Sequence, residues 1–213
     1  DLRKGDFTVY KRSDLQAVSD NELNKPYDLL KKVSNWRRFY AVINAASVFM
    51  EKAPRTVELD RSYSEQNLKY DIAQVRALRA FAYFYMVRIW GDVPLVTYSY
   101  DNGTFPSMPR TDAQTVLSYA KAELLTAIKD LPYQYGTQTN LYYGSYGAQW
   151  QGKLFNKLSA YSVLAHICAW QGNYAEAETY SAFIIDHASE INAKYTSITD
   201  LTSETGLFYS NAS

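Results

Sequence analysis

The chain has 213 residues, with 22 Lys plus Arg against 22 Asp plus Glu, and 47% of its residues are hydrophobic. This composition is typical of a globular protein with a sizeable core, and it excludes a disordered chain. A formal net charge of zero gives no overall attraction to nucleic acid. No apolar run is long enough for a transmembrane helix. The one cysteine, Cys168, cannot form an intrachain disulfide, and we expect it to be a small core residue.

Apolar residues recur at the three-and-four spacing of helix faces along most of the chain, which predicts an all-α fold. The first predicted helix runs from Pro26 to about Met50, and Pro54 marks its end. The second covers residues 74–90 and stops at Gly91. It is apolar on opposite sides, so we expect it to be buried nearly all round.

Three more helices are predicted after residue 110. Thr111 and Gln114 have the spacing of a capping box at the start of the third, and Asn173 and Glu176 have it at the start of the fifth. No segment shows the sustained period-two alternation of a half-buried strand. These three helices are expected at residues 111–131, 156–170 and 173–187.

Two of the helix ends are similar, which indicates a repeated helix-turn-helix unit. "RIWGDVP" at 88–94 and "CAWQGNYA" at 168–175 both close an aromatic-rich helix with Trp, then Gly, then Asp or Asn. In the later unit Gly172 ends one helix, and the small Ala177 lets the next helix approach closely, as in a tetratricopeptide turn. The earlier unit would be the same pair with residues 91–110 inserted. We therefore expect a tetratricopeptide-like stack with long inserted loops.

No catalytic or metal-binding motif is present in the sequence. It has no Gly-x-Ser-x-Gly elbow, no phosphate-binding glycine loop and no Cys or His pair at metal-ligand spacing, so no catalytic residue, metal or cofactor is predicted. His166 is expected to be a packed, hydrogen-bonded histidine of the fourth helix. His187, at the end of the fifth, is expected to make a capping or dipole contact. The paired carboxylates of a glycosidase cannot be recognised from sequence, so that activity stays a third alternative.

Aromatic residues make up 15% of the chain, and 20 of them are tyrosines, whose amphipathic rings suit half-wet surfaces. Many lie between the predicted helices. In residues 131–155, aromatics alternate with Gly, Ser, Gln and Asn and with hardly any charge. Such loops suit a sugar ring, but they suit a protein partner equally well. Six aromatics at helical spacing are instead expected in the core: Trp36, Tyr40, Phe81, Phe84, Trp90 and Trp170.

Four segments form an ordered set. They are "NWRRFYAVINAAS" at 35–47, "VRALRAFAYFYMVRIWGDVPLV" at 75–96, "MPRTDAQTVLSYAKAELLTAIKDLP" at 108–132, and the Ala-rich helix with its Gly-Asn-Tyr turn at 157–185. This set resembles the SusD/RagB-like nutrient-binding lipoproteins of the Bacteroidota outer membrane. Two positions depart from the family pattern: Ser47 stands where Asn is usual, and Gln74 stands where Glu commonly precedes the arginine pair.

The arginine pair of the second motif, Arg76 and Arg79, lies on one helix face. The two side chains could grip an anionic ligand bidentately. Alternatively, they could pair with carboxylates and carbonyls of adjacent helices, as buried arginines must. We favour the second interpretation, because members of the resembling family with many specificities share the pair.

The resemblance also implies a domain organisation. Residues 1–26 would be a loop segment that follows a missing first helix. Residues 27–190 would form the tetratricopeptide-like helical domain, and residues 191–213 would begin a truncated, loop-rich C-terminal part. The implied location is the cell surface, on the outer membrane, with a lipid anchor outside this fragment.

The function implied by the resemblance is non-catalytic. The protein would bind a glycan, either an oligosaccharide or a polysaccharide, and deliver it to a SusC-like TonB-dependent transporter, with no nucleic-acid partner. The alternative is a helical-repeat scaffold that binds only a protein; loop aromatics buried in contacts, rather than exposed in a row, would favour it. The candidate ligand-binding residues lie before Trp36 and in the 131–155 loop: Phe7, Tyr10, Arg12, Tyr143, Tyr146 and Trp150.

Overall fold

The computed structural model describes residues 8–100, 106–135 and 153–191. These residues are helical or irregular and contain no β-strand, apart from one isolated antiparallel bridge between Val93 and Thr111. The predicted all-α fold class is thus confirmed. In chain order the elements are α1 (Ser13–Ser19), α2 (Asp28–Val33), α3 (Arg37–Leu59), α4 (Glu65–Trp90), α5 (Ala113–Ala127), α7 (Lys157–Trp170), α8 (Tyr174–Asp186) and the 3-10 helix η3 (Ala188–Ile191).

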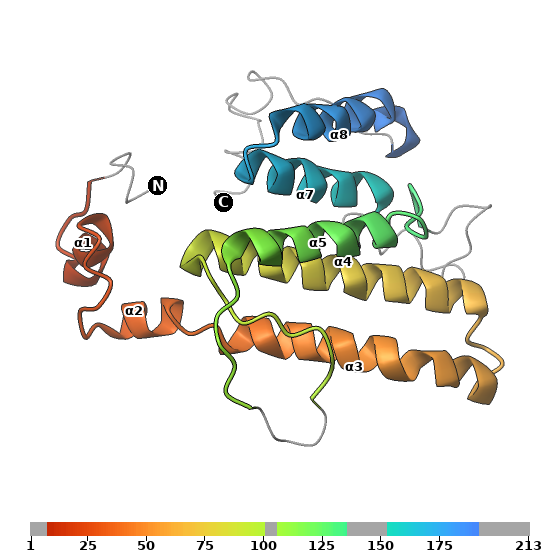
Figure 1. Cartoon of the computed structure of the whole chain (residues 1–213), viewed down its shortest axis with the longest axis horizontal. Coiled ribbons are helices and arrows are strands. Elements are labelled where there is room, and N and C mark those ends of the chain that lie inside the picture. Colours follow the sequence, from red (N-terminus) through yellow and green to blue (C-terminus); the bar gives the residue numbers. More distant parts are fainter. Residues whose placement is uncertain (1–7, 101–105, 136–152, 192–213) are drawn as a thin grey trace, which may run out of the picture.

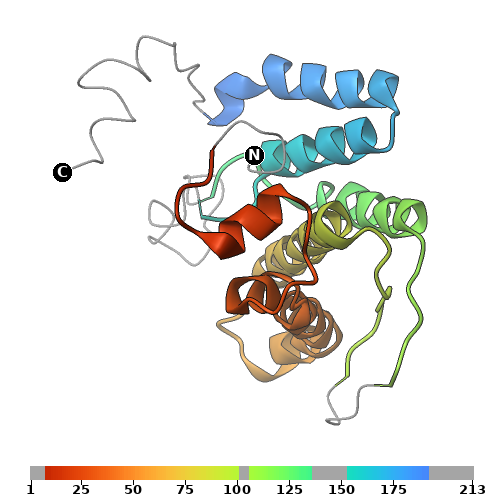
Figure 2. The same cartoon turned by 90° about the vertical axis from the view of Figure 1, so that its left-hand side faces the viewer.

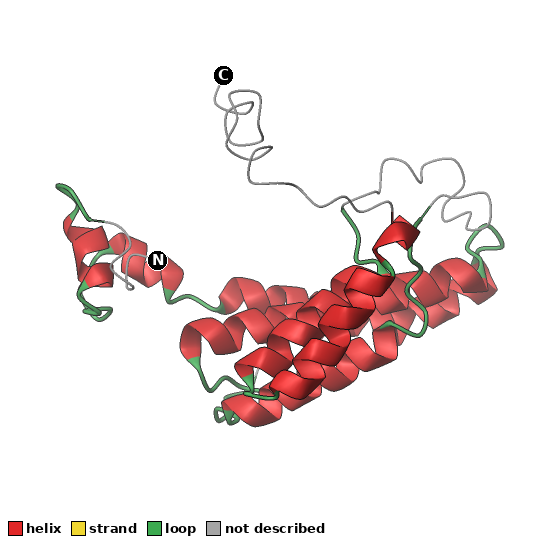
Figure 3. Cartoon of the chain, turned by 90° about the horizontal axis from the view of Figure 1, so that it is seen from above, coloured by secondary structure: helices red, strands yellow, loops and turns green. Residues whose placement is uncertain are grey.

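The long helices form a stack around α4. Helix α4 packs against α3 on one side and α5 on the other, α5 packs against α7, and α7 packs against α8. Figure 1 shows α3, the α4–α5 pair, α7 and α8 one above another, and Figure 3 shows their long axes running in similar directions. The α4–α5 and α7–α8 pairs are the two helix-turn-helix units that the similar helix ends predicted.

Each repeat turn depends on a glycine with positive φ. Gly91 follows α4 with φ 69°, and Gly172 follows α7 with φ 80°. This left-handed region is strained for residues with a Cβ atom, so glycine is the favoured residue at both positions. After Gly172 the side chain of Asn173 accepts a hydrogen bond from the Glu176 amide, which starts α8 at the predicted cap.

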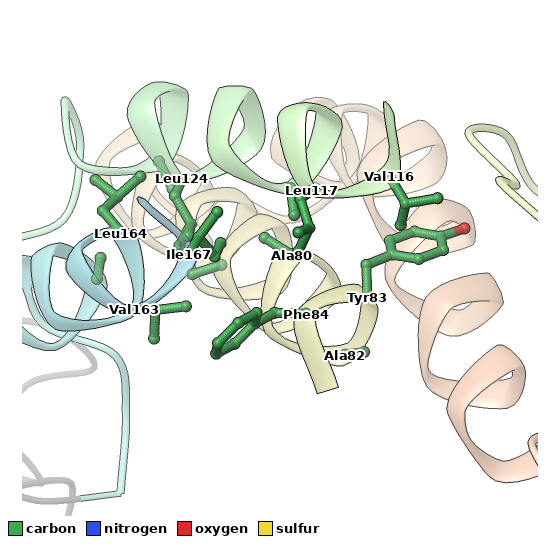
Figure 4. Close-up of a cluster of buried hydrophobic side chains, with 14 of the residues drawn as sticks. Ala80, Ala82, Tyr83, Phe84, Val116, Leu117, Leu124, Val163, Leu164 and Ile167 are labelled. Atoms are coloured by element: carbon green, nitrogen blue, oxygen red, sulfur yellow. The ribbon is translucent and has the colours of Figure 1, made fainter. Parts of the chain in front are cut away.

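The core lies where α4, α5 and α7 meet (Figure 4). Each large apolar side chain that is fully buried there stabilises the fold by about 1.5–3 kcal/mol. Cys168 is fully buried, as the sequence predicted. The largest fully buried side chains from the three helices include Tyr83, Met86, Leu117, Leu124, Leu164 and Ile167.

Arg79 of α4 is a buried cation with 5% of its surface exposed. Its Nε donates to Glu123 Oε2 of α5 at 3.2 Å, and its Nη1 donates to Ser47 Oγ of α3 at 2.9 Å. Arg76 Nη1 donates to the other Glu123 oxygen at 2.8 Å. The two arginines therefore link three helices, which confirms that they pair within the stack.

Gln74 does not pair with these arginines. Its Oε1 accepts a hydrogen bond from the Phe155 amide at 2.9 Å, and its Nε2 contacts the Phe155 carbonyl and the Tyr135 hydroxyl. Tyr135 in turn donates to the Phe155 carbonyl at 2.8 Å. Gln74 thus links Tyr135, which follows α5, to Phe155, which precedes α7.

Several helix boundaries differ from the prediction. The helix expected from Pro26 to about Met50 is divided into α2 and α3, because the Asn35 side chain accepts from the Arg37 amide at 3.0 Å and forms a turn. Pro54 lies inside α3 rather than at its end. Packing of α3 against the stack, including buried Ala53, outweighs the hydrogen bond that Pro54 cannot donate.

Two further boundary expectations were also wrong in detail. Helix α4 begins at Glu65, capped by Ser64, rather than at residue 74. The cap of α5 is Asp112 and not Thr111, because the Asp112 carboxylate accepts from the amides of Gln114 and Thr115. The α5 start was thus predicted to within one residue.

The segment before residue 27, which was expected to be a loop, contains helix α1. Two residues that were expected to be packed in the core are exposed instead. His166 is exposed on α7 rather than packed. Trp170 is 53% exposed at the end of α7, although helical spacing placed it in the core. His187 closes α8 as expected, with its Nδ1 2.9 Å from the Phe183 carbonyl oxygen.

We expect Glu123→Gln to lower the free energy of unfolding by about 3 kcal/mol, because it leaves Arg79 buried without its counterion. Chemical denaturation measures this change. Glu178→Gln, on the exposed surface of α8, is the control and should change stability by less than about 0.5 kcal/mol. Equal stability of the two variants would mean that the ion pair does not hold the stack together.

Candidate ligand-binding site

Residues 8–33 form an arm, made of α1 and α2, that extends from the end of the stack where α3 begins (Figures 1 and 3). Figure 2 views the molecule from this end. Helix α1 packs on α2, and Ala17 and Leu30 are the buried residues of the two helices. The arm is thus a small, polar-surfaced unit at the edge of the helical domain.

Tyr10 lies just before α1, in the N-terminal part of the arm, and 77% of its surface is exposed. The next residue, Lys11, has φ 54°, which is unusual for a residue other than glycine. Its ammonium group lies 4.9 Å from the centroid of the Tyr10 ring. A backbone in this region costs of order 1 kcal/mol, and such strain concentrates at functional sites.

Arg12 and Asp14 form a bidentate ion pair at the start of α1. Arg12 Nε and Nη2 donate to the two Asp14 oxygens at 2.8 and 2.7 Å. The hydrogen bonds from Arg12 lower the pKa of the Asp14 carboxyl to about 2, and Asp14 raises the pKa of Arg12. The pair fixes the guanidinium plane while leaving Arg12 largely exposed.

A hollow of about 540 Å³ lies between α1 and the segment that leads to α2. Gln16 on its wall donates to Asp20 at 2.9 Å, so these side chains are held in place. The wall offers amide, carboxylate, guanidinium and ammonium groups, which can bond to hydroxyl groups. The polar side chains that line it are Lys11, Arg12, Ser13, Gln16, Asp20, Glu22 and Lys25, with Tyr27 at one side.

A second hollow, of about 470 Å³, lies at the start of α3, where the arm joins the stack. Trp36 and Tyr40 supply apolar surface, and Asn35, Arg37 and Asn44 supply polar groups. The Trp36 ring is wedged edge-on against Tyr40, and the Tyr40 hydroxyl donates to the Pro94 carbonyl at 2.7 Å. Burial raises the pKa of Tyr40.

The loop that follows α4 docks along α3 beside this hollow. Asn44 makes two hydrogen bonds to the Tyr100 backbone, at 3.0 and 2.7 Å. Tyr100 donates its hydroxyl to that of Tyr98 at 2.7 Å, and their ring centroids are 5.0 Å apart. Tyr98 is 52% exposed, so this pair adds a second accessible aromatic surface.

Of the predicted site residues, Arg12 lines the arm hollow, while Tyr10 lies two residues earlier in the chain and is exposed without being part of the lining. Phe7, Tyr143, Tyr146 and Trp150 lie outside the described residues. Sequence reasoning did not find the hollow at Trp36, because helical spacing assigned that residue to the core. Asn35 and Asn44, which lie on either side of Trp36 and Tyr40 in the sequence, were the available signal for a polar hollow there.

Among the residues that the structure describes, no three His, Cys, Asp or Glu side chains are grouped so that they could hold a metal ion. Within the same residues, no helix is long and apolar enough to cross a bilayer.

The fold is that of a helical-repeat protein with exposed aromatic and polar hollows. No protein-family model matches the chain. SusD-like protein P38 of Formosa agariphila is 31% identical over 147 residues, covering 68% of this chain and 24% of that protein. A solved SusD superfamily protein from Bacteroides thetaiotaomicron is 99% identical to this chain, with a TM-score of 0.90. The match covers 100% of this chain and 47% of that protein.

A solved laminarin-binding SusD-like protein is 24% identical, with a TM-score of 0.63, over 87% of this chain and 34% of that one; this likeness concerns the fold alone. The chain belongs to the SusD-like family, as its ordered motifs indicated. It spans less than half the length of these relatives.

We expect the carboxyl of Asp14 to titrate near pH 2 in the folded protein. Because the pKa is lowered by Arg12, the charged pair persists from neutral pH through the ordinary Asp range and is lost only near pH 2. NMR titration of the Asp14 carboxyl carbon measures this. Arg12→Gln should move the midpoint towards 3.8, while Arg37→Gln, on α3, should leave it unchanged. A wild-type midpoint near 3.8 would exclude the pair in solution.

Proposed function

We propose that the protein captures a glycan at the cell surface, with the arm as part of its binding platform. The observation that carries this proposal is the exposed Tyr10 ring, which contacts Lys11 on the wall of a hollow of amide, guanidinium and carboxylate groups. The apolar face of a sugar ring stacks on an aromatic ring, and its hydroxyl groups bond to such polar side chains. Membership of the SusD-like family, which includes a laminarin-binding protein, supports the same ligand class.

The proposed site suits weak, repeated contacts rather than tight enclosure. Both hollows are open to solvent and are rimmed by exposed side chains, so each sugar unit would gain few contacts and dissociate quickly. A polysaccharide that touches several such places is still retained, because the later contacts form at high effective concentration. Fast release at each contact suits a protein that hands its ligand on.

The partner in our proposal is a SusC-like TonB-dependent transporter, to which the glycan would be delivered without chemical change. The proposed location is the outer membrane at the cell surface, with attachment through a lipid anchor outside this chain. These assignments rest on membership of the SusD-like family. We propose a capture role without catalysis, in which the ligand is bound and released intact.

A protein-only scaffold is the second candidate function, and the contacts that several tyrosines make within the stack favour it. The Tyr63 hydroxyl donates to Asp71 at 2.7 Å. Tyr70 packs edge-on against the buried Tyr135, and Tyr133 stacks on His187. These tyrosines make contacts within the stack and are buried or only partly exposed. Tyr10 and Tyr98 are exposed instead, so substitutions at these two residues distinguish glycan capture from a protein-only scaffold.

We expect Tyr10→Ala to weaken glycan retention about fivefold or more, because one aromatic stacking surface contributes about 1 kcal/mol or more. The measurement is affinity electrophoresis of the full-length protein in gels that contain plant, host or microbial polysaccharides. Trp150→Ala tests the loop before α7 in the same gels.

Leu59→Ala is the matched control, because Leu59 is an exposed apolar residue at the opposite end of α3 and its loss should not alter retention. The released sugars are measured as well. Retention with no sugar released supports capture. Hydrolysis would support a glycosidase, and mobility that no polysaccharide changes would favour the protein-only scaffold.

A further inference from the structure

The turn between α7 and α8 exposes two large aromatic side chains. Trp170 is 53% exposed and Tyr174 is 73% exposed. At the corresponding position at the end of α4, Trp90 packs instead against Trp36, with ring centroids 6.1 Å apart. Arg88 of α4 lies 5.6 Å from the centroid of the Trp170 ring and so helps to hold that ring in place. The two residues flank Gln171 and Asn173 in the turn and add exposed aromatic surface there.

A hollow of about 510 Å³ opens beside this turn, between α5 and the start of α8. Gln114, Ser118, Gln171 and Asn173 line it with amide and hydroxyl groups, and Leu125 supplies apolar surface. Gln171 Nε2 donates to Gln114 Oε1 at 3.2 Å, so the two amides are oriented by each other. Each amide keeps further donor and acceptor positions for a ligand.

The charge in this hollow is balanced. Lys121, the cation on its wall, forms an ion pair with Glu176 at 2.5 Å. Glu176 also accepts hydrogen bonds from Asn173 at 2.6 Å and from the Tyr180 hydroxyl at 3.0 Å. The hydrogen bonds from Lys121 and Tyr180 lower the pKa of Glu176, so the carboxylate stays charged and Lys121 stays neutralised. A charged ligand would therefore find no free counterion here, whereas a neutral polyhydroxylated one would find several hydrogen-bond partners.

We propose that this hollow, together with Trp170 and Tyr174, is a second saccharide subsite that takes a neutral pyranose unit. The side-chain amides bond to ring hydroxyls, and an exposed aromatic ring covers the apolar face of the sugar. The volume is in the range of small-ligand pockets. This inference rests on the proposed glycan capture and adds a second contact to it, on the helical stack instead of the arm.

The position of the turn supports a shared polymer ligand. The α7–α8 turn and the start of α5 lie at the end of the stack from which the arm extends (Figures 1 and 2). A polysaccharide chain that extends across this end of the stack would contact both the arm and the turn. Because the second contact then forms within an existing complex, its loss should weaken polymer binding much more than the binding of a short oligosaccharide.

The test uses the full-length protein and the neutral and acidic polysaccharides of the electrophoresis panel, with laminarin, mannan, galactan and xyloglucan as the neutral members. The variants are Gln171→Ala and Tyr174→Ala, with Glu178→Ala on the exposed surface of α8 as the control. Gln171 and Tyr174 are not core residues, so circular dichroism should show that all variants fold. Calorimetry with a trisaccharide of the retained polymer measures the short-ligand affinity.

We expect Gln171→Ala and Tyr174→Ala each to weaken retention by a neutral polysaccharide roughly tenfold, with a smaller change for the trisaccharide and none for the control. Retention that is unchanged in both variants but lost in Tyr10→Ala would overturn the second subsite and leave capture by the arm intact. Retention by acidic polysaccharides alone would overturn the neutral specificity. No retention of the wild-type protein by any polysaccharide would overturn both proposals.

Discussion

The pairing of Arg79 with Glu123 is the interaction on which the rest of the structure depends. A buried guanidinium must be neutralised and hydrogen-bonded, and here its partners come from both neighbours of α4: Glu123 on α5 and Ser47 on α3. Ser47 and Glu123 lie 32 and 44 residues from Arg79 along the chain, so these contacts fix the relative register of α3, α4 and α5. Ser47 can do this although the family usually has Asn there, because its hydroxyl accepts from Arg79 and donates to the Ile43 carbonyl.

The fixed stack also positions the loop after α4. The buried hydroxyl of Tyr83 donates to the Val96 carbonyl at 2.7 Å and accepts from the Val96 amide at 2.8 Å. Farther along, Asn44 makes the same kind of paired bond to the Tyr100 backbone. Buried polar groups thus replace regular secondary structure in satisfying this loop's backbone. Exposed Tyr98 is presented on a rigid support as a result.

The arm and the stack have different roles in the protein. The stack carries the core and the buried ion pair, so its sequence is constrained by packing. The arm buries few residues and presents Tyr10 at a backbone turn with positive φ, so its surface is available for a ligand. A binding surface carried mainly by such segments can change specificity without disturbing the fold.

Local sequence signals predicted the parts of the fold that depend on local chemistry. Gly91 and Gly172 ended the helices that they were expected to end, and Asn156 and Asn173 began α7 and α8. The extent of α3 could not be predicted this way. Pro54 is an ordinary stop signal, and only the packing of the helix against the stack carries it on to Leu59.

The sequence by itself determined the helical class, the repeated turns, the family and the pairing of the arginines within the stack, because these depend on spacing, glycine conformation and the cost of burying a charge. Only the tertiary structure decided which aromatic rings reach solvent. Trp90 and Trp170 end similar helices in similar motifs, yet Trp90 packs against Trp36 at the start of α3, while 53% of the Trp170 surface stays exposed. That difference depends on which neighbour each helix has in space, and spacing along one helix carries no information about it.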